Sequence, residues 1–197
     1  MVQGREGDVS ESGGTFVFED ADAGVRFTVD GRFVPGPKAA PSADLGLDLV
    51  RSAYLAFTDE EGRQYVLSVS SLPVEHGPTR EELEDLAARQ NGYNAALAAE
   101  RGWTVHEVGR VATLGGTLAR YNEFVTPGTH PDDRETVAGD EDASSHVQAW
   151  TVFPPGRAVS LMLGVHPPGD LDEARAIMKT VTGTIEFSGE DDEGDTT

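Results

Sequence analysis

Strict alternation of apolar and polar residues predicts four β-hairpins along the chain. The first joins residues 15–19 to residues 25–29, and a turn at Asp30-Gly31 continues it into residues 32–34, because Gly accepts the positive φ of a two-residue turn. The other three join residues 51–58 to 63–72, residues 103–111 to 116–125, and residues 146–153 to 157–165. Adjacent hairpins pair in the antiparallel sense, so the sequence predicts an antiparallel sheet.

Two stretches instead repeat apolar residues every three or four positions, which predicts helices. The longer one, residues 79–101, opens with Thr79 and Glu82 at capping-box spacing and is followed by Gly102, which favours a left-handed helix end. Its expected buried stripe is Leu83, Leu86, Gln90, Tyr93 and Leu97. The shorter helix starts at Asp170, with Glu173 three residues on, and a last strand follows over residues 183–187. Its expected buried positions are Leu171, Ala174, Ile177 or Met178, and Val181.

This order of elements predicts an α+β fold. Two helices cannot bury their apolar stripes alone, so we expect an antiparallel β-sheet sandwiched by the long central helix and the short C-terminal helix. We expect one domain over residues 14–188, with disordered tails at residues 1–13 and 189–197, which are polar, Gly-rich and acidic. Residues 126–145 lack apolar periodicity and are long for a connection, so we expect a mobile acidic loop there.

The charge of the chain excludes two classes of partner. Lys and Arg number 15 against 35 Asp and Glu, for a formal net charge of −20. Such a surface repels phosphate backbones and anionic headgroups, so we expect no nucleic acid partner and no direct membrane binding. The acidity fits a GC-rich genome, a salt-adapted proteome or a cationic partner, and the sequence does not choose among them.

Cysteine usage and hydropathy bear on the compartment. The chain has no cysteine, which excludes disulfides and thiolate zinc sites. No apolar run is long enough to span a bilayer, and the first residues do not resemble a signal peptide. We therefore expect a cytoplasmic protein, unless an N-terminal signal has been removed.

No motif in the sequence points to catalysis. His106-Glu107 begins a zinc-protease motif, but Arg110 stands where the second histidine is needed. Nucleophile elbows, phosphate-binding glycine loops and dinucleotide fingerprints do not occur, and the acidic runs are typical of solvated loops. We therefore expect a protein that is not an enzyme and that has no cofactor, no metal and no catalytic residue.

The third and fourth hairpins place polar side chains between apolar ones. On one face of residues 117–125 these are Leu118, Arg120, Asn122 and Phe124, and on one face of residues 146–153 they are His146, Gln148, Trp150 and Val152. A sheet face of this kind, only partly covered by a helix, can receive a peptide or a small hydrophobic ligand. It is also typical of an ordinary half-solvated sheet.

A succession of short segments resembles the PsbP/DcrB-like superfamily over roughly residues 50–187. The segments are Tyr65-Val-Leu-Ser-Val69 before Thr79-Arg-Glu-Glu82, then Leu114-Gly-Gly-Thr-Leu-Ala-Arg120, a strand centred on Gln148, Gly156-Arg157, and Ile177-Met-Lys-Thr-Val181. The superfamily includes the extrinsic photosystem II protein PsbP, a Ran-binding nuclear import factor and adaptors for bacterial secretion effectors. Its usual Pro-x-x-Trp near the first strands has no counterpart in this chain.

The resemblance implies an antiparallel sheet between helices and action by binding, with no catalytic residue to carry over. Its secretion-adaptor members are thought to cradle a hydrophobic segment on the sheet, which singles out Arg120, Asn122, Gln148 and Trp150 as partner-binding residues. We therefore expect a non-catalytic protein-binding module, such as an adaptor, chaperone or assembly factor, that presents a sheet face to a partner protein.

Three alternatives stay open at the level of sequence. The first is a carrier of a small hydrophobic ligand, with its cavity between helix 79–101 and the sheet. The second is an enzyme that uses His106 or His146 with loop carboxylates. In the third, the acidic residues 189–197 bind a basic partner.

Overall fold

The computed structural model describes residues 14–21, 23–36, 51–126 and 144–188. The predicted tails, residues 1–13 and 189–197, lie outside the described residues. So do residues 37–50 and most of the predicted loop 126–145. Thr126 and Ser145, at the two ends of that loop, are strand residues that pair with each other.

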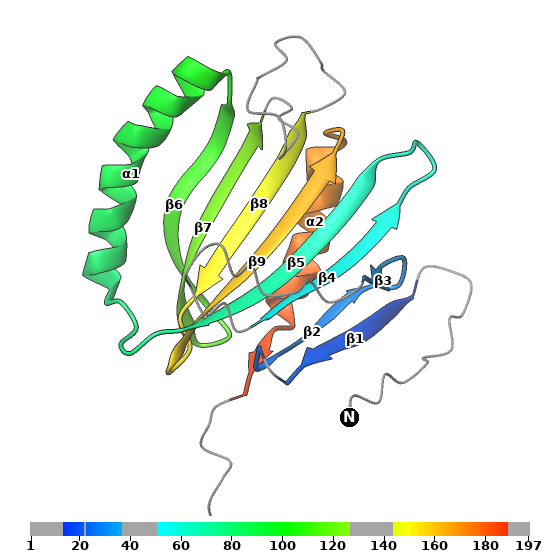
Figure 1. The fold of residues 1–197 in the computed structure, drawn as a ribbon, viewed down its shortest axis with the longest axis horizontal. Coiled ribbons are helices and arrows are strands. Elements are labelled where there is room, and N and C mark those ends of the chain that lie inside the picture. The colour runs from blue at the N-terminus through cyan, green and yellow to red at the C-terminus, as the bar shows by residue number, and fades with distance from the viewer. Residues whose placement is uncertain (1–13, 22, 37–50, 127–143, 189–197) are drawn as a thin grey trace, which may run out of the picture.

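A seven-stranded antiparallel sheet forms the main layer of the molecule (Figure 1). Its strands are, in spatial order, β3 (Val34–Pro35), β4 (Arg51–Thr58), β5 (Gln64–Pro73), β9 (Arg157–His166), β8 (Ser145–Val152), β7 (Thr117–Thr126) and β6 (Thr104–Leu114). The predicted second, third and fourth hairpins are confirmed as β4–β5, β6–β7 and β8–β9. Pairing of β5 with β9 joins the second hairpin to the fourth.

A second, three-stranded sheet contains β1 (Thr15–Asp20), β2 (Val25–Asp30) and β10 (Glu186–Phe187). The β1–β2 hairpin confirms the pairing expected for residues 15–19 and 25–29, whereas the predicted continuation through Asp30-Gly31 is wrong. β3 pairs with β4 of the large sheet instead of with β2. Phe33 is buried edge-to-face on Phe57 of β4, with ring centroids 4.7 Å apart, and this contact draws the chain across to the large sheet.

Helix α1 (Arg80–Arg101) begins and ends where the sequence predicts. The Glu82 amide donates to Thr79 Oγ1 (3.2 Å), the Thr79 amide donates to Glu82 Oε2 (2.7 Å), and Gly102 ends the helix with φ 69°. The predicted buried stripe is only partly correct, because Leu83 is buried but Leu86 is 39% exposed. α1 packs mainly along the edge strand β6, so only a narrow strip of its residues is buried.

Helix α2 (Leu171–Gly183) lies behind the large sheet in Figure 1 and buries the positions that the sequence predicts except Leu171, which is only half-buried. Those positions are Ala174, Ile177, Met178 and Val181. Asp170 caps the helix by accepting a hydrogen bond from the amide of Asp172 (2.8 Å). Glu173 does not complete a capping box, since its carboxylate accepts instead from the Tyr65 hydroxyl (2.7 Å) and from Arg32 (3.0 Å). The side chain of Glu173 thereby fastens α2 to β5 and to the end of β2.

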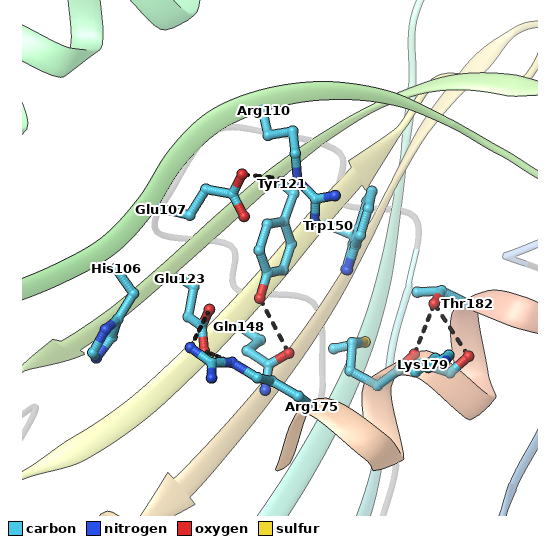
Figure 2. Close-up of a pocket in the computed structure, with 11 residues that line it drawn as sticks. His106, Glu107, Arg110, Tyr121, Glu123, Gln148, Trp150, Arg175, Lys179 and Thr182 are labelled. Carbon is cyan, nitrogen blue, oxygen red and sulfur yellow. Dashed lines mark hydrogen bonds and ion pairs between the residues drawn. The ribbon is translucent and has the colours of Figure 1, made fainter. Parts of the chain in front are cut away.

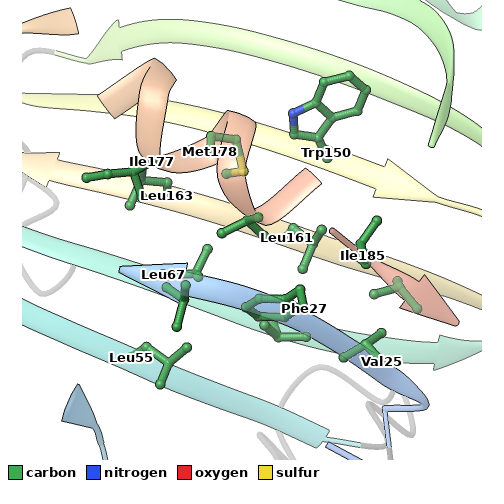
Figure 3. Close-up of a cluster of buried hydrophobic side chains, with 14 of the residues drawn as sticks. Val25, Phe27, Leu55, Leu67, Trp150, Leu161, Leu163, Ile177, Met178 and Ile185 are labelled. Carbon is green, nitrogen blue, oxygen red and sulfur yellow. The ribbon is translucent and has the colours of Figure 1, made fainter. Parts of the chain in front are cut away.

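The core lies between the inner face of the large sheet and a layer made of α2 and the small sheet (Figure 3). Leu67 and Leu161 contribute from the large sheet, Phe27 from β2 and Met178 from α2. Arg157 of β9 links the two sheets by donating to the carbonyl oxygens of Ala23 (3.1 Å) and Ser188 (2.6 Å), which lie together at one end of the small sheet. None of the helices in the described ranges is long and apolar enough to cross a membrane.

The two helices lie on opposite faces of the large sheet. Gly109 of β6 and Arg120 of β7 lie close to Ala87 of α1, so α1 covers the outer face at one edge. The small sheet and most of α2 cover the inner face nearer the other edge. The inner face over β6, β7 and β8 is therefore open to one side, and the candidate site lies there.

Candidate binding pocket

A pocket of about 460 Å³ lies on the inner face of the large sheet, beside α2 (Figure 2). The strands β6, β7 and β8 supply most of its lining, namely His106, Glu107, Arg110, Tyr121, Glu123, Gln148 and Trp150. α2 supplies Arg175, Met178, Lys179 and Thr182. A second, smaller pocket borders the small sheet, and neither pocket is lined by a residue of α1. The sequence-based alternative of a ligand carrier placed its cavity at α1, on the opposite side of the sheet.

Strand register brings the central residues of this pocket together. In the β7–β8 pair, Tyr121 lies opposite Trp150 and Glu123 lies opposite Gln148, so all four side chains share one face. β6 carries two register shifts, one before Glu107 and one before Arg110. The second shift contains Gly109 with φ 70°, and after it Arg110 lies opposite Tyr121, with its side chain lining the pocket.

An aromatic pair under an arginine forms one end of the pocket. The rings of Tyr121 and Trp150 are tilted by 39° with their centroids 4.7 Å apart. The guanidinium carbon of Arg110 lies 4.8 Å from the centroid of Tyr121 and 5.5 Å from that of Trp150, which is cation–π geometry. Arg110 Nε also forms an ion pair with Glu107 Oε1 at 2.9 Å, so this carboxylate orients the arginine over the rings.

A buried carboxylate forms the other end. Glu123 is only 4% exposed, and its carboxylate contacts His146 Nε2 (2.9 Å) and accepts from Arg175 Nε (3.0 Å) and Nη2 (3.3 Å). Burial alone would raise the pKa of Glu123, but the hydrogen bonds from Arg175 and His146 outweigh burial and lower it. Glu123 is therefore a carboxylate anion at neutral pH, and it holds β7, β8 and α2 together.

Gln148 lies between these two ends. Its Oε1 accepts a hydrogen bond from the Tyr121 hydroxyl at 3.2 Å, which Figure 2 shows as a dashed line. The side chain is 2% exposed, and its Nε2 has no hydrogen-bond partner in the part of the chain that the structure describes. Burial and the neighbouring Glu123 raise the pKa of Tyr121, so its hydroxyl stays protonated and serves as a donor. The amide nitrogen of Gln148 is thus a buried donor without an acceptor.

The four residues predicted to bind a partner are divided between the two faces of the sheet. Gln148 and Trp150 lie in the pocket. Arg120 and Asn122 lie on the opposite face near α1, where Asn122 Oδ1 accepts from the Gly109 amide (3.0 Å) and from Arg120 Nη2 (3.3 Å). Burial lowers the pKa of Arg120. Alternation in the sequence shows which residues of one strand share a face. It does not show which residues of the neighbouring strand lie on that same face of the sheet.

Several pocket residues escape the sequence reasoning. Tyr121 and Glu123 alternate with Arg120 and Asn122 along β7, so the sequence shows that Tyr121 and Glu123 share a face. Only the register between β7 and β8 shows that Gln148 lies on that face too. Arg110 and Arg175 carry no sequence signal, because they reach the pocket through a bulge in β6 and through the packing of α2. His146 was considered as a catalytic alternative, and the structure places it in the interior, 1% exposed and bonded to Glu123.

Protonation of His146 is expected to make the fold sensitive to mild acid. Burial lowers the pKa of this imidazole below its usual value of 6.5, and the hydrogen bond to Glu123 only partly opposes this effect. Below pH 6.5 the unfolded chain therefore binds a proton that the folded protein does not, and stability falls with decreasing pH. We expect this one group to remove up to about 1.4 kcal/mol per pH unit until its folded pKa is reached.

The measurement is urea unfolding at several pH values between 7 and 5. His146→Gln keeps a donor for Glu123 but does not titrate, so its free energy of unfolding should fall less steeply than that of the unmodified protein. His76→Gln removes an exposed histidine and should leave the slope unchanged. Equal slopes for the unmodified protein and His146→Gln would show that His146 does not control this acid sensitivity.

A known structure shares this arrangement of an antiparallel sheet flanked by helices, which is the PsbP-like α+β fold. The chain is similar to the cyanobacterial PsbP (CyanoP) of Synechocystis sp. PCC 6803, with TM-score 0.53, 16% identity, and coverage of 94% of this chain and 99% of that one. LpqN of Mycobacterium tuberculosis, a protein involved in cell envelope biogenesis, aligns with TM-score 0.48, 16% identity, and coverage of 89% and 91%. No protein-family model matches the sequence, and no curated protein matches it. The resemblance seen in the sequence is confirmed at the level of the fold.

Proposed function

We propose that this protein is a non-catalytic binding module that holds a partner protein at the pocket beside α2. One observation carries the proposal. Gln148 and Trp150, which the family resemblance implies as partner-binding residues, lie together in one pocket, side by side on β8. One of them offers a buried donor without an acceptor, and the other offers an aromatic ring.

The carboxylates of the pocket also favour binding over acid–base chemistry. The Glu123 carboxylate is bonded to both Arg175 and His146, and the Glu107 carboxylate is bonded to Arg110. A general acid or base needs a proton site that faces the substrate at a pKa near the working pH. Carboxylates fixed by internal ion pairs instead orient their neighbours, as Glu107 orients Arg110 over the two rings.

Site-directed photocrosslinking tests the proposal against the opposite face of the sheet. Thr182 lines the pocket, and Met162 of β9 is 44% exposed on the outer face. p-Benzoylphenylalanine is introduced at either position, and the protein is irradiated in native cell extract. We expect one protein to crosslink to the Thr182 position and not to the Met162 position. Crosslinking confined to the Met162 position would overturn the pocket as the binding surface and favour the outer sheet face.

A small-molecule carrier is the second candidate, and the size of the pocket favours it. A volume of about 460 Å³ lies within the range of roughly 300–1,000 Å³ that is typical of small-ligand sites. Native mass spectrometry of freshly purified protein should then show an added mass that is lost on denaturation. Detection of the bare chain alone, together with a crosslinked protein at the Thr182 position, would favour the partner-binding function.

A further inference from the structure

We infer that the pocket takes a carboxylate carried on an apolar group. The inference rests on the proposed binding function and names the chemistry that the same pocket recognises. Three features of the described residues support it: a buried donor, a surplus positive charge and an apolar wall.

The buried donor is the amide nitrogen of Gln148. Its own carbonyl oxygen is used by the Tyr121 hydroxyl, so the free end of the amide can only donate. A buried donor without an acceptor is unfavourable, and a ligand that brings an acceptor removes this penalty. An ionised oxygen is the strongest acceptor that can do so, because hydrogen bonds to a charged group are shorter and stronger than neutral ones.

The surplus positive charge is that of Lys179. The pocket lining contains three cations, Arg110, Arg175 and Lys179, and two carboxylates. Each carboxylate is paired with one arginine, whereas Lys179 forms no ion pair with any described residue. In a chain with a net charge of −20, this locally positive lining attracts an anion that the rest of the surface repels.

The apolar wall is formed by Trp150 of β8 and Met178 of α2, which line the same pocket as Gln148 and Lys179. An aromatic ring and a thioether bind an apolar group without a fixed direction, and such contacts are favourable in a pocket that excludes water. An anion without an apolar part, such as inorganic phosphate, would leave this wall in contact with water. The lining therefore fits an anion attached to an apolar body better than a bare anion.

Two kinds of molecule carry this chemistry. One is a free apolar acid. The other is the terminal carboxylate of a partner protein whose last residue is apolar, which is the form that the proposed partner-binding function requires. Both place an ionised carboxylate beside an apolar side group, and the experiment distinguishes them with separate probes.

The experiment is an NMR titration that follows the side-chain amide of Gln148 and the indole N–H of Trp150. The free-acid probe is 3-phenylpropionate, and its uncharged counterpart is 3-phenylpropionamide. The peptide probe is a hexapeptide ending in Leu-Phe with a free carboxylate, and its counterpart is the same peptide with an amidated end. We expect the carboxylate of each pair to bind at least about tenfold more tightly and to shift the Gln148 amide resonances.

Two variants connect this preference to the named residues. Lys179→Gln should weaken carboxylate binding about three- to tenfold, whereas Arg26→Gln, which removes one charge from the small sheet, should leave it unchanged. Gln148→Met keeps the length of the side chain and removes the amide, so it should reduce the preference for carboxylate to the part that Lys179 supplies. The same substitution should change the melting temperature little, because it removes the unpaired amide donor but also removes the acceptor of the Tyr121 hydroxyl.

The outcomes separate this inference from the function on which it rests. Equal binding of each acid and its amide, or unchanged binding in Lys179→Gln, would overturn the carboxylate inference, and crosslinking at the Thr182 position would leave the binding function standing. Binding of 3-phenylpropionate without crosslinking at the Thr182 position would support the carboxylate inference with a free acid as ligand, and it would remove the partner-protein function. If Gln148→Met fails to fold, the comparison of Lys179→Gln with Arg26→Gln decides.

Discussion

Replacing Gly109 with alanine is expected to lower the free energy of unfolding by about 3–4 kcal/mol. Gly109 has φ 70°, and a Cβ there would lie 2.5 Å from the Cβ and 2.9 Å from the Cα of Ala87. The positive φ alone accounts for about 1–2 kcal/mol of the effect. The rest comes from the collision, because backbone atoms of α1 cannot move aside unless the helix shifts away from β6. Urea unfolding monitored by circular dichroism measures the change.

Gly116 provides the matched control for Gly109. It also has a positive φ, 80°, but a Cβ there would have no atom within 4 Å. Gly116→Ala should therefore cost only the backbone strain, about 1–2 kcal/mol. Similar losses in the two variants would mean that α1 does not press on β6 at Gly109.

The second large effect is expected at Glu123. Glu123→Leu should lower the free energy of unfolding at pH 7 by about 3 kcal/mol, because it leaves the buried His146 without its hydrogen-bond partner. The share that comes from Arg175 is smaller, since the guanidinium side chain is 44% exposed and its ion pair is screened by water. Chemical denaturation at pH 7 measures the loss.

A double-mutant cycle shows whether Glu123 and Arg175 act as one unit. Arg175→Leu should cost about 1–2 kcal/mol and should raise the pKa of Glu123, because it removes the partner that most stabilises the anion. The double variant should be about as stable as Glu123→Leu alone. Strictly additive losses would contradict a shared network, since independent sites add to within about 0.5 kcal/mol.

Much of the fold follows from the sequence because the signals are local. The hairpins β4–β5, β6–β7 and β8–β9 depend on alternation and on turns between neighbouring segments, and the start of α1 depends on two residues of the capping box. The error at Asp30-Gly31 has a long-range cause. A local turn signal favours continuing the hairpin, and the burial of Phe33 against Phe57, more than twenty residues further along the chain, favours the other sheet.

Only two of the four predicted partner-binding residues lie in the pocket, and the cause is again a long-range contact between strands. The sequence predicts that Gln148 and Trp150 share one face of β8. Which residues of β7 lie on that face depends on the pairing of Tyr121 with Trp150. The contribution of β6 depends on a bulge at Gly109, whose left-handed conformation has no distinctive sequence around it. Arg120 and Asn122 consequently belong to a different environment, close to α1.

The position of α2 sets the order in which the molecule can be completed during translation. β6, β7 and β8 all leave the ribosome before α2, yet the pocket needs Arg175 and Lys179, and the core needs Ile177, Met178 and Val181. Until residue 183 has emerged, the inner face of the large sheet has no cover from α2, and Glu123 has no guanidinium partner. The pocket is therefore incomplete in the nascent chain, and the binding proposed for it requires that the C-terminal helix has docked.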